Sequence, residues 1–152
     1  MGMFKELSSQ YYSIENEYAK QEFKAYLRGW AKKEIQVRRK REVNDQAYFL
    51  FMFSRLEDKI NQEVTKKVAK MKASNQSWKV KAPWENLPNR VKDINFKNRA
   101  ALLFEKGKAD FKLISDYYEE RNSIAHGGSF VKAISMPTAI ADLERLYRRV
   151  RA

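Results

Sequence analysis

The first two-thirds of the chain contains very little glycine or proline, and this feature limits the fold more than any other. Through that part, apolar side chains recur at every third or fourth position, which is the spacing of one face of an α-helix. No stretch alternates apolar and polar residues in the manner of a half-buried strand, and no internal repeat competes with the helical pattern. The sequence therefore predicts an all-α protein.

Two long helices are predicted in the N-terminal half. The first runs from about residue 8 to about residue 41 and ends in the basic run 38–41, because cations are favoured at a helix C-terminus. Asn44 is then the predicted N-cap of a second helix, which extends to about residue 71. Residues 48–53 near its start are apolar all round, so they lie either at the centre of a bundle or in a subunit contact.

Shorter helices are predicted in the rest of the chain. A loop with two prolines follows at 74–89, and a short helix at about 90–106. The next helical pattern ends at Gly127 and Gly128, and a final amphipathic helix follows. With 152 residues, of which 43% are hydrophobic, the chain has enough apolar surface for one core. We therefore expect one domain over residues 1–152, built as a bundle of about five helices.

Basic residues outnumber acidic ones by 31 to 19, which gives a formal net charge of +12. The resulting positive field favours nucleic acid, an acidic protein or an anionic membrane as a partner. The absence of cysteine excludes a disulfide framework, a thiolate nucleophile and a cysteine zinc site, and it fits a reducing compartment. With one histidine and no recognisable cluster of acids, neither a catalytic metal site nor a cofactor is predicted.

No membrane segment or targeting signal is predicted. The longest apolar run, at 47–53, is far shorter than the roughly 20 residues that cross a bilayer. The N-terminus becomes charged before any apolar stretch that would suit a signal peptide, and it carries no myristoylation signal. We therefore expect the protein to lie in the cytoplasm without a membrane partner.

The single histidine, His126, follows Arg121 and Asn122 at the end of a predicted helix. Histidine exchanges protons near neutral pH, and arginine grips phosphate oxygens, so these side chains suit work on a phosphodiester. On a helix Asn122 and His126 share a face, whereas Arg121 lies about 140° round the axis from His126. A structural role is the alternative. A protonated histidine in the last turn interacts favourably with the helix dipole, and Gly127 can end the helix in the left-handed conformation.

Cleavage of RNA by its own 2′-hydroxyl needs one group that accepts a proton, one that donates a proton, and positive charge at the phosphorus. This chain offers one imidazole only. A symmetric dimer that brings two copies of the motif to its two-fold axis would supply two imidazoles and two guanidiniums. RNA cleavage by this motif therefore requires a homodimer with a composite site.

The run 121–126, Arg-Asn-Ser-Ile-Ala-His, resembles the signature of the HEPN superfamily, which has an arginine, a polar residue, a short spacer and a histidine late in a helical domain. The predicted order of two long helices, a shorter one, a motif helix and a closing helix is similar too. The resemblance implies a metal-independent endoribonuclease that acts as a dimer and leaves a 2′,3′-cyclic phosphate and a 5′-hydroxyl. It assigns the acid/base role to His126, the phosphate clamp to Arg121 and a polar supporting role to Asn122.

The same resemblance implies two further features. Some members carry an extra acid on the helix before the motif, for which Glu57 or Asp58 is the candidate here, although ordinary surface ion pairing is the favoured role of both. Many members are toxins of toxin–antitoxin or phage-defence systems. Such a role implies a neutralising partner, either an acidic antitoxin or a nucleotidyltransferase-like protein.

A stripe of cations is the main candidate surface for RNA. Its members are Lys20, Lys24, Arg28, Lys32, Arg38 and Arg39. Like charges four residues apart repel on a helix, and a bound polyanion would relieve this repulsion and make binding depend steeply on salt. The alternative is a solvated face whose charge is softened by nearby glutamates.

The loop tryptophans Trp78 and Trp84 stand among cations, as aromatic residues do where they stack on unpaired bases, but packing onto the core is the favoured role. A second function also stays open at this point. It is a non-catalytic basic adaptor that binds nucleic acid or an acidic protein through the cation stripe, while His126 only caps a helix.

Overall fold

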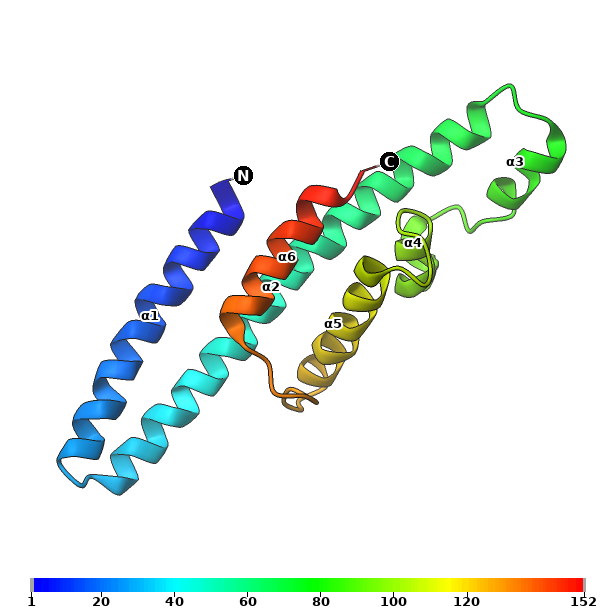
Figure 1. The fold of residues 1–152 in the computed structure, drawn as a ribbon. Helices are drawn as coiled ribbons and strands as arrows, with labels where there is room; N and C mark the ends of the chain where they lie inside the picture. The colour runs from blue at the N-terminus through cyan, green and yellow to red at the C-terminus, as the bar shows by residue number, and fades with distance from the viewer. Residues whose placement is uncertain (1, 152) are drawn as a thin grey trace. The chain divides into compact units, whose positions relative to one another are not determined.

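The computed structural model describes residues 2–151, and within that range the secondary structure is entirely helical (Figure 1). The elements are α1 (Gly2–Leu27), α2 (Ala31–Ala73), α3 (Trp78–Glu85), the 3-10 turn η1 (Val91–Asp93), α4 (Phe96–Ala101), α5 (Ala109–Ala125) and α6 (Met136–Arg149). The prediction of an all-α protein is confirmed. Over the described residues, six α-helices take the place of the five that were expected.

Two compact units divide the chain. The first comprises the residues up to Phe53 together with Glu120–Glu144, and the second comprises Ser54–Glu119 together with the residues from Arg145 onward. The helices α2, α5 and α6 each contribute to both units. The expectation of one domain over residues 1–152 stays a prediction, because units that share three helices are compatible with one domain or with two.

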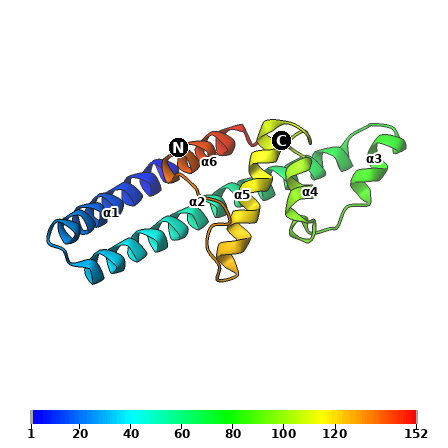
Figure 2. The same ribbon diagram turned by 60° about the horizontal axis from the view of Figure 1, so that its bottom comes forward.

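In the first unit, α1 and the N-terminal half of α2 run side by side as a helical hairpin (Figure 1, Figure 2). The turn between them is set by Gly29, which takes a left-handed conformation with φ of 64°. The Gly29 N–H donates to the Tyr26 carbonyl at 3.0 Å, and the Trp30 N–H donates to the Ala25 carbonyl at 2.9 Å. This pair of hydrogen bonds is the Schellman motif, which satisfies the last carbonyls of a helix when a glycine follows it.

The predicted boundary between the two long helices is therefore wrong. The chain turns at residues 28–30, and α2 then continues without interruption through the basic run 38–41, which was expected to end a helix. Asn44 is not an N-cap but a buried residue inside α2. The three arginines of the basic run are neutralised by acids of α1 and α2 rather than by a helix C-terminus.

The segment that is apolar all round is buried on one side only. Phe49, Met52 and Phe53 are fully buried in the core of the first unit, whereas Phe51 is 58% exposed, so the choice between a bundle centre and a subunit contact for residues 48–53 stays open. The ring of Phe130 packs edge-on against Phe49 with centroids 5.4 Å apart. The segment that follows α5 is thereby joined to the middle of α2.

The second unit is built on the C-terminal half of α2. Its apolar face is fully buried along the helix, with Leu56, Ile60 and Val64 at the expected spacing. At the start of α5, Asp110 accepts hydrogen bonds from Arg145 and Arg149 of the closing helix, each at 2.6 Å. These contacts join α6 to α5 inside this unit.

The region between α2 and α5 differs most from expectation. The predicted loop 74–89 contains α3, although Pro83 removes one backbone donor from that helix. The predicted helix at 90–106 is reduced to η1 and α4, because Asn95 starts a new helix by accepting a hydrogen bond from the Lys97 N–H at 3.0 Å. Trp78 does not pack onto the core, since 75% of its surface is exposed.

Candidate functional site

The candidate motif occupies the last turn of α5 and the residue that follows it. Arg121 and Asn122 are half-buried, whereas His126 is exposed at the position directly after the helix. Gly127 takes a left-handed conformation with φ of 82°, as the structural interpretation of the motif predicted. The Gly128 N–H donates to the Ser123 carbonyl at 2.9 Å and the Gly127 N–H donates to the Ile124 carbonyl at 3.0 Å, which is a second Schellman motif.

Arg121 and Asn122 are joined directly. The guanidinium Nη1 of Arg121 donates a hydrogen bond to the Asn122 side-chain oxygen at 3.2 Å. The amide nitrogen of Asn122 can then donate to a ligand. Within residues 2–151, the ring of His126 makes no hydrogen bond to Asn122, so the expected orientation of the imidazole by Asn122 is not part of this structure.

A buried glutamate fixes the segment after the motif. Glu120 is 5% exposed, and its carboxylate accepts hydrogen bonds from the backbone N–H groups of Val131 at 2.6 Å and Lys132 at 3.1 Å. The Ser123 hydroxyl adds a hydrogen bond to the Ser129 carbonyl at 2.7 Å. The last turn of α5 and residues 129–132 are thus held together on both sides of Arg121.

This role of Glu120 was not predicted from the sequence. The partners of Glu120 are backbone amides, which every residue except proline carries, so no residue type marks them in the sequence. The only signal near Glu120 in the sequence is the pair of glycines at 127 and 128, which predicts a turn but does not identify the acid that binds it. The structure therefore adds a positioning residue to the predicted motif.

A groove of about 360 Å³ lies beside this loop in the first unit. Its walls are Arg39, Glu42, Asp45 and Gln46 of α2 and residues 129–134. Burial raises the pKa of Asp45, against the opposing effect of a hydrogen bond that the Tyr11 hydroxyl donates to it at 2.8 Å. The groove combines cationic and acidic groups, and His126 is not among its walls.

The predicted RNA-binding cations separate into two groups. Lys20, Lys24, Arg28 and Lys32 are exposed, but they belong to α1, the turn and the start of α2 instead of one continuous helix. Within residues 2–151, none of these four forms an ion pair with an acid.

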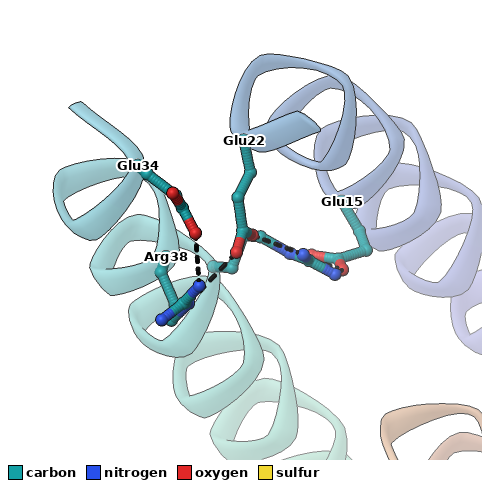
Figure 3. A network of polar contacts seen from close by, with 5 residues as sticks. Glu15, Glu22, Glu34 and Arg38 are labelled. Carbon is teal, nitrogen blue, oxygen red and sulfur yellow. Dashed lines mark hydrogen bonds and ion pairs between the residues drawn. The ribbon is translucent and has the colours of Figure 1, made fainter. Parts of the chain in front are cut away.

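Arg38 and Arg39 form the second group and are paired. Arg38 donates to Glu22 of α1 at 3.1 Å and to Glu34 of its own helix at 2.8 Å, as Figure 3 shows. Arg39 donates to Glu42 at 3.0 Å. The charge of both arginines is therefore offset by neighbouring acids, in contrast to the charge of the first group.

Glu57, the additional acid suggested by resemblance, lies in the second unit. It accepts a hydrogen bond at 3.3 Å from Arg99, which also donates to Asn61. Arg99 is 7% exposed, so this ion pair is largely shielded from water. Glu57 is therefore ion-paired, but with a buried arginine instead of a surface partner, while Asp58 is exposed.

Neither a metal cluster nor a membrane span occurs in the part of the chain that the structure describes. Residues 2–151 contain no group of three or more histidine, aspartate or glutamate side chains arranged to hold a metal ion. No helix in the same range combines the length and the apolar character needed to cross a membrane. Comparisons with protein-family models, with curated proteins and with solved structures found no match for this chain.

Proposed function

We propose that the protein is an endoribonuclease of the HEPN type, in which Arg121, Asn122 and His126 act on the RNA backbone. One observation carries this proposal: an arginine and an asparagine joined by a hydrogen bond lie about one helical turn before the exposed histidine at the end of α5. The set offers an acid/base, a fixed positive charge and an amide donor, which are the groups that phosphodiester cleavage needs.

The proposed reaction uses the substrate's own nucleophile. The ribose 2′-oxygen attacks the adjacent phosphorus while a neutral imidazole of His126 accepts the 2′ proton. The bond from phosphorus to the 5′-oxygen breaks, and the leaving oxygen receives a proton from a second, protonated imidazole. The products are a 2′,3′-cyclic phosphate and a 5′-hydroxyl, and the guanidinium of Arg121 stabilises the charge that develops on the phosphorane.

A homodimer supplies the second imidazole. One imidazole cannot accept and donate a proton at the same instant, and the chain contains a single histidine. His126 is exposed at the end of its helix, so a two-fold axis near this end would bring two copies together. The scheme needs neither a metal ion nor a cofactor.

Wider aspects of the proposal rest on the resemblance and on composition. We place the protein in the cytoplasm, as a toxin of a toxin–antitoxin or phage-defence system. Its partner would be an acidic antitoxin or a nucleotidyltransferase-like protein, because a net charge of +12 attracts acidic surfaces.

A second candidate function is a non-catalytic adaptor. It is favoured by one observation: the four exposed cations around the turn between α1 and α2 form no ion pair with an acid within residues 2–151. The adaptor would bind RNA or an acidic protein through the exposed cations around the turn between α1 and α2.

The decisive experiment compares the wild type with His126→Ala on labelled total RNA in excess EDTA. We expect the wild type to cleave and the variant to lose at least about a hundredfold in rate, as is typical when a general acid or base is removed. Both proteins must first give the same circular dichroism spectrum and oligomeric mass. Arg121→Ala should also lose activity, whereas Arg90→Ala, a change of an exposed arginine in the second unit, should not.

Two results would reject the enzyme. Equal cleavage by wild type and His126→Ala would show that the activity does not come from this motif. Absence of cleavage by both, with salt-sensitive RNA binding retained in both, would favour the adaptor.

A further inference from the structure

Large apolar side chains are concentrated on the outside of the helical hairpin at its turn. We call residues 20–35 the hairpin tip. Its exposed members and their exposed fractions are Phe23 with 62%, Tyr26 with 65%, Leu27 with 67%, Trp30 with 49% and Ile35 with 65%. Large exposed apolar side chains that lie close together on a surface mark sites of interaction.

These side chains are not part of the hairpin's own packing. The contact between α1 and α2 near the tip is made by the inward side, where Ala25 is 1% exposed and Val37 is fully buried. Tyr26 and Leu27 lie three and four residues after Phe23 along the outer side of α1, so the three side chains are neighbours and form one stripe. The stripe is therefore available to a ligand.

The hairpin tip also carries unbalanced positive charge. Its five cations are Lys20, Lys24, Arg28, Lys32 and Lys33, and all of them are exposed. Its two acids, Glu22 and Glu34, both point to arginines of α2, and Arg38 contacts the two of them (Figure 3). Hydrogen bonds from Arg41, opposed by burial and assisted by Arg38, lower the pKa of Glu22, so this acid stays ionised and committed to its own network.

This charge selects among the possible ligands. A second copy of the chain would place cations against cations, which is unfavourable. A polyanion with apolar groups fits both properties of the surface. Single-stranded nucleic acid has phosphates for the cations and flat bases for the rings, and such sites combine these two kinds of contact.

We propose that the hairpin tip binds single-stranded RNA, with bases stacked on Phe23, Tyr26 and Trp30 and the backbone held by the surrounding cations. The Arg28 guanidinium already lies over the Trp30 ring, 4.9 Å from its centroid. A guanidinium plane on an aromatic ring is itself a surface on which bases stack. The inference rests on the proposed function in one respect, because it takes RNA as the ligand and names unpaired RNA as the substrate class.

The binding test uses the His126→Ala protein, so that RNA stays intact. Fluorescence anisotropy with a short uridine-rich strand compares this protein with the triple variant Phe23→Leu, Tyr26→Leu and Trp30→Leu, which keeps apolar side chains but removes the rings. We expect at least about a tenfold loss of affinity, because stacking on one ring contributes that much per base. The matched control changes Phe51→Leu, which removes an exposed ring outside the hairpin tip, and it should keep its affinity.

The charge contribution is tested separately. Replacing Lys20, Lys24 and Lys32 by glutamine should lower the slope of log affinity against log salt by about two, since each neutralised phosphate of a single strand contributes about 0.7. The matched control replaces exposed lysines of the second unit, Lys106, Lys108 and Lys112, and it gives the same net charge. Its slope should be unchanged.

The outcomes separate this inference from the proposed function. Loss of binding in the ring variant supports the inference even if the wild type cleaves no RNA, in which case only the proposed function fails. Unchanged RNA affinity in the ring variant overturns the inference even if the wild type is an active ribonuclease. A different variant, Leu27→Ser with Ile35→Ser, tests for a membrane. Loss of phosphatidylglycerol vesicle binding in this variant, with unchanged RNA affinity in the ring variant, would instead assign the tip to an anionic membrane.

Discussion

Glu120 is the residue on which the geometry of the candidate site depends most directly. Its buried carboxylate accepts two backbone N–H groups from the segment after the motif, and its neighbour in sequence is Arg121. A carboxylate that accepts two amides forms charge-assisted hydrogen bonds, which are stronger than neutral ones. The position of residues 131–132 therefore depends on this one side chain.

Changing Glu120→Gln should lower the free energy of unfolding by about 1–3 kcal/mol, because the neutral amide has one acceptor oxygen for two backbone donors and loses the charge-assisted hydrogen bonds. Urea unfolding measures the loss, and amide hydrogen exchange at Val131 and Lys132 should become faster. Glu119→Gln is the matched control, since Glu119 makes an exposed ion pair with Lys97 that contributes at most about 1 kcal/mol. Equal effects of the two changes would contradict the role of Glu120.

Position 128 has no room for a side chain, because Ser123 lies close to the Gly128 backbone. A Cβ at this position would lie 2.8 Å from the Ser123 carbonyl oxygen and 2.9 Å from its hydroxyl oxygen. Gly128→Ala should therefore displace the loop or break the hydrogen bond to Ser129, with a loss of about 1–3 kcal/mol in the free energy of unfolding. A crystal structure of the variant with an unshifted loop would refute this expectation.

At the scale of the element, the turn between α1 and α2 depends on a single left-handed residue. Gly29→Ala should lower the free energy of unfolding by about 1–2 kcal/mol, because an alanine Cβ is unfavourable in this conformation. A Cβ added at Gly29 would meet nothing within 4 Å, so the cost comes from the backbone and not from a clash. Gly29→Asn should cost less, since asparagine tolerates positive φ, and thermal unfolding of the two variants compares them directly.

The ion-pair network between α1 and α2 makes the free energy of unfolding depend on pH in the acidic range. Glu22 has a lowered pKa in the folded protein, so in mildly acidic solution the unfolded chain binds more protons than the folded one. Its contribution is present above the unfolded pKa of about 4.5 and is lost as the pH falls through the lower, folded pKa. Urea unfolding from neutral to acidic pH should therefore show a smaller acid-induced loss in Glu22→Gln than in the wild type, and Glu17→Gln serves as control.

Sequence analysis located α5 and α6 well because their signals are local. The stripe of α6 and the glycines after α5 define these helices from neighbouring residues alone. The long helices were divided at the wrong place because the run 38–41 was interpreted as a helix end. Two of its arginines, Arg38 and Arg41, instead pair with acids of another helix, Glu15 and Glu22. Pairing across a hairpin depends on three-dimensional proximity, which periodicity does not contain, and Gly29 was the local signal that identifies the turn.

In the candidate site, too, only the features that depend on neighbouring residues could be predicted from the sequence. Arg121, Asn122 and His126 could be placed at a helix end from the sequence, since the helical pattern and the following glycines determine that position. The hydrogen bond between Arg121 and Asn122 and the role of Glu120 could not be foreseen, because they depend on side-chain rotamers and on the path of the chain after the helix.

At the scale of the whole molecule, the proposed composite site makes a prediction about mixtures of wild type and His126→Ala. A heterodimer of the two carries one imidazole, which cannot both accept and donate a proton in the same step. After dissociation and random reassociation of equal amounts, about a quarter of the dimers keep both imidazoles. The cleavage rate should therefore fall to about a quarter of that of the same total amount of wild type.

Independent sites give a different result for the same mixture, because half of the chains would stay active and about half of the rate would remain. Native mass spectrometry of the mixture reports the heterodimer content and confirms that subunits have exchanged. A rate of about one half in a fully exchanged mixture would refute the shared site.

The capping of α5 by glycine amides separates folding from activity at two adjacent positions. Gly127 fixes the end of the helix through its left-handed backbone, while the ring of His126 contributes no hydrogen bond within the described chain. A saturation library selected for protease resistance should accept almost any residue at position 126 and mainly glycine or asparagine at position 127. A preference at position 126 that emerges only under selection for activity would then report on the chemistry of the side chain. Elsewhere in a protein, such a preference also contains the effect of each substitution on stability.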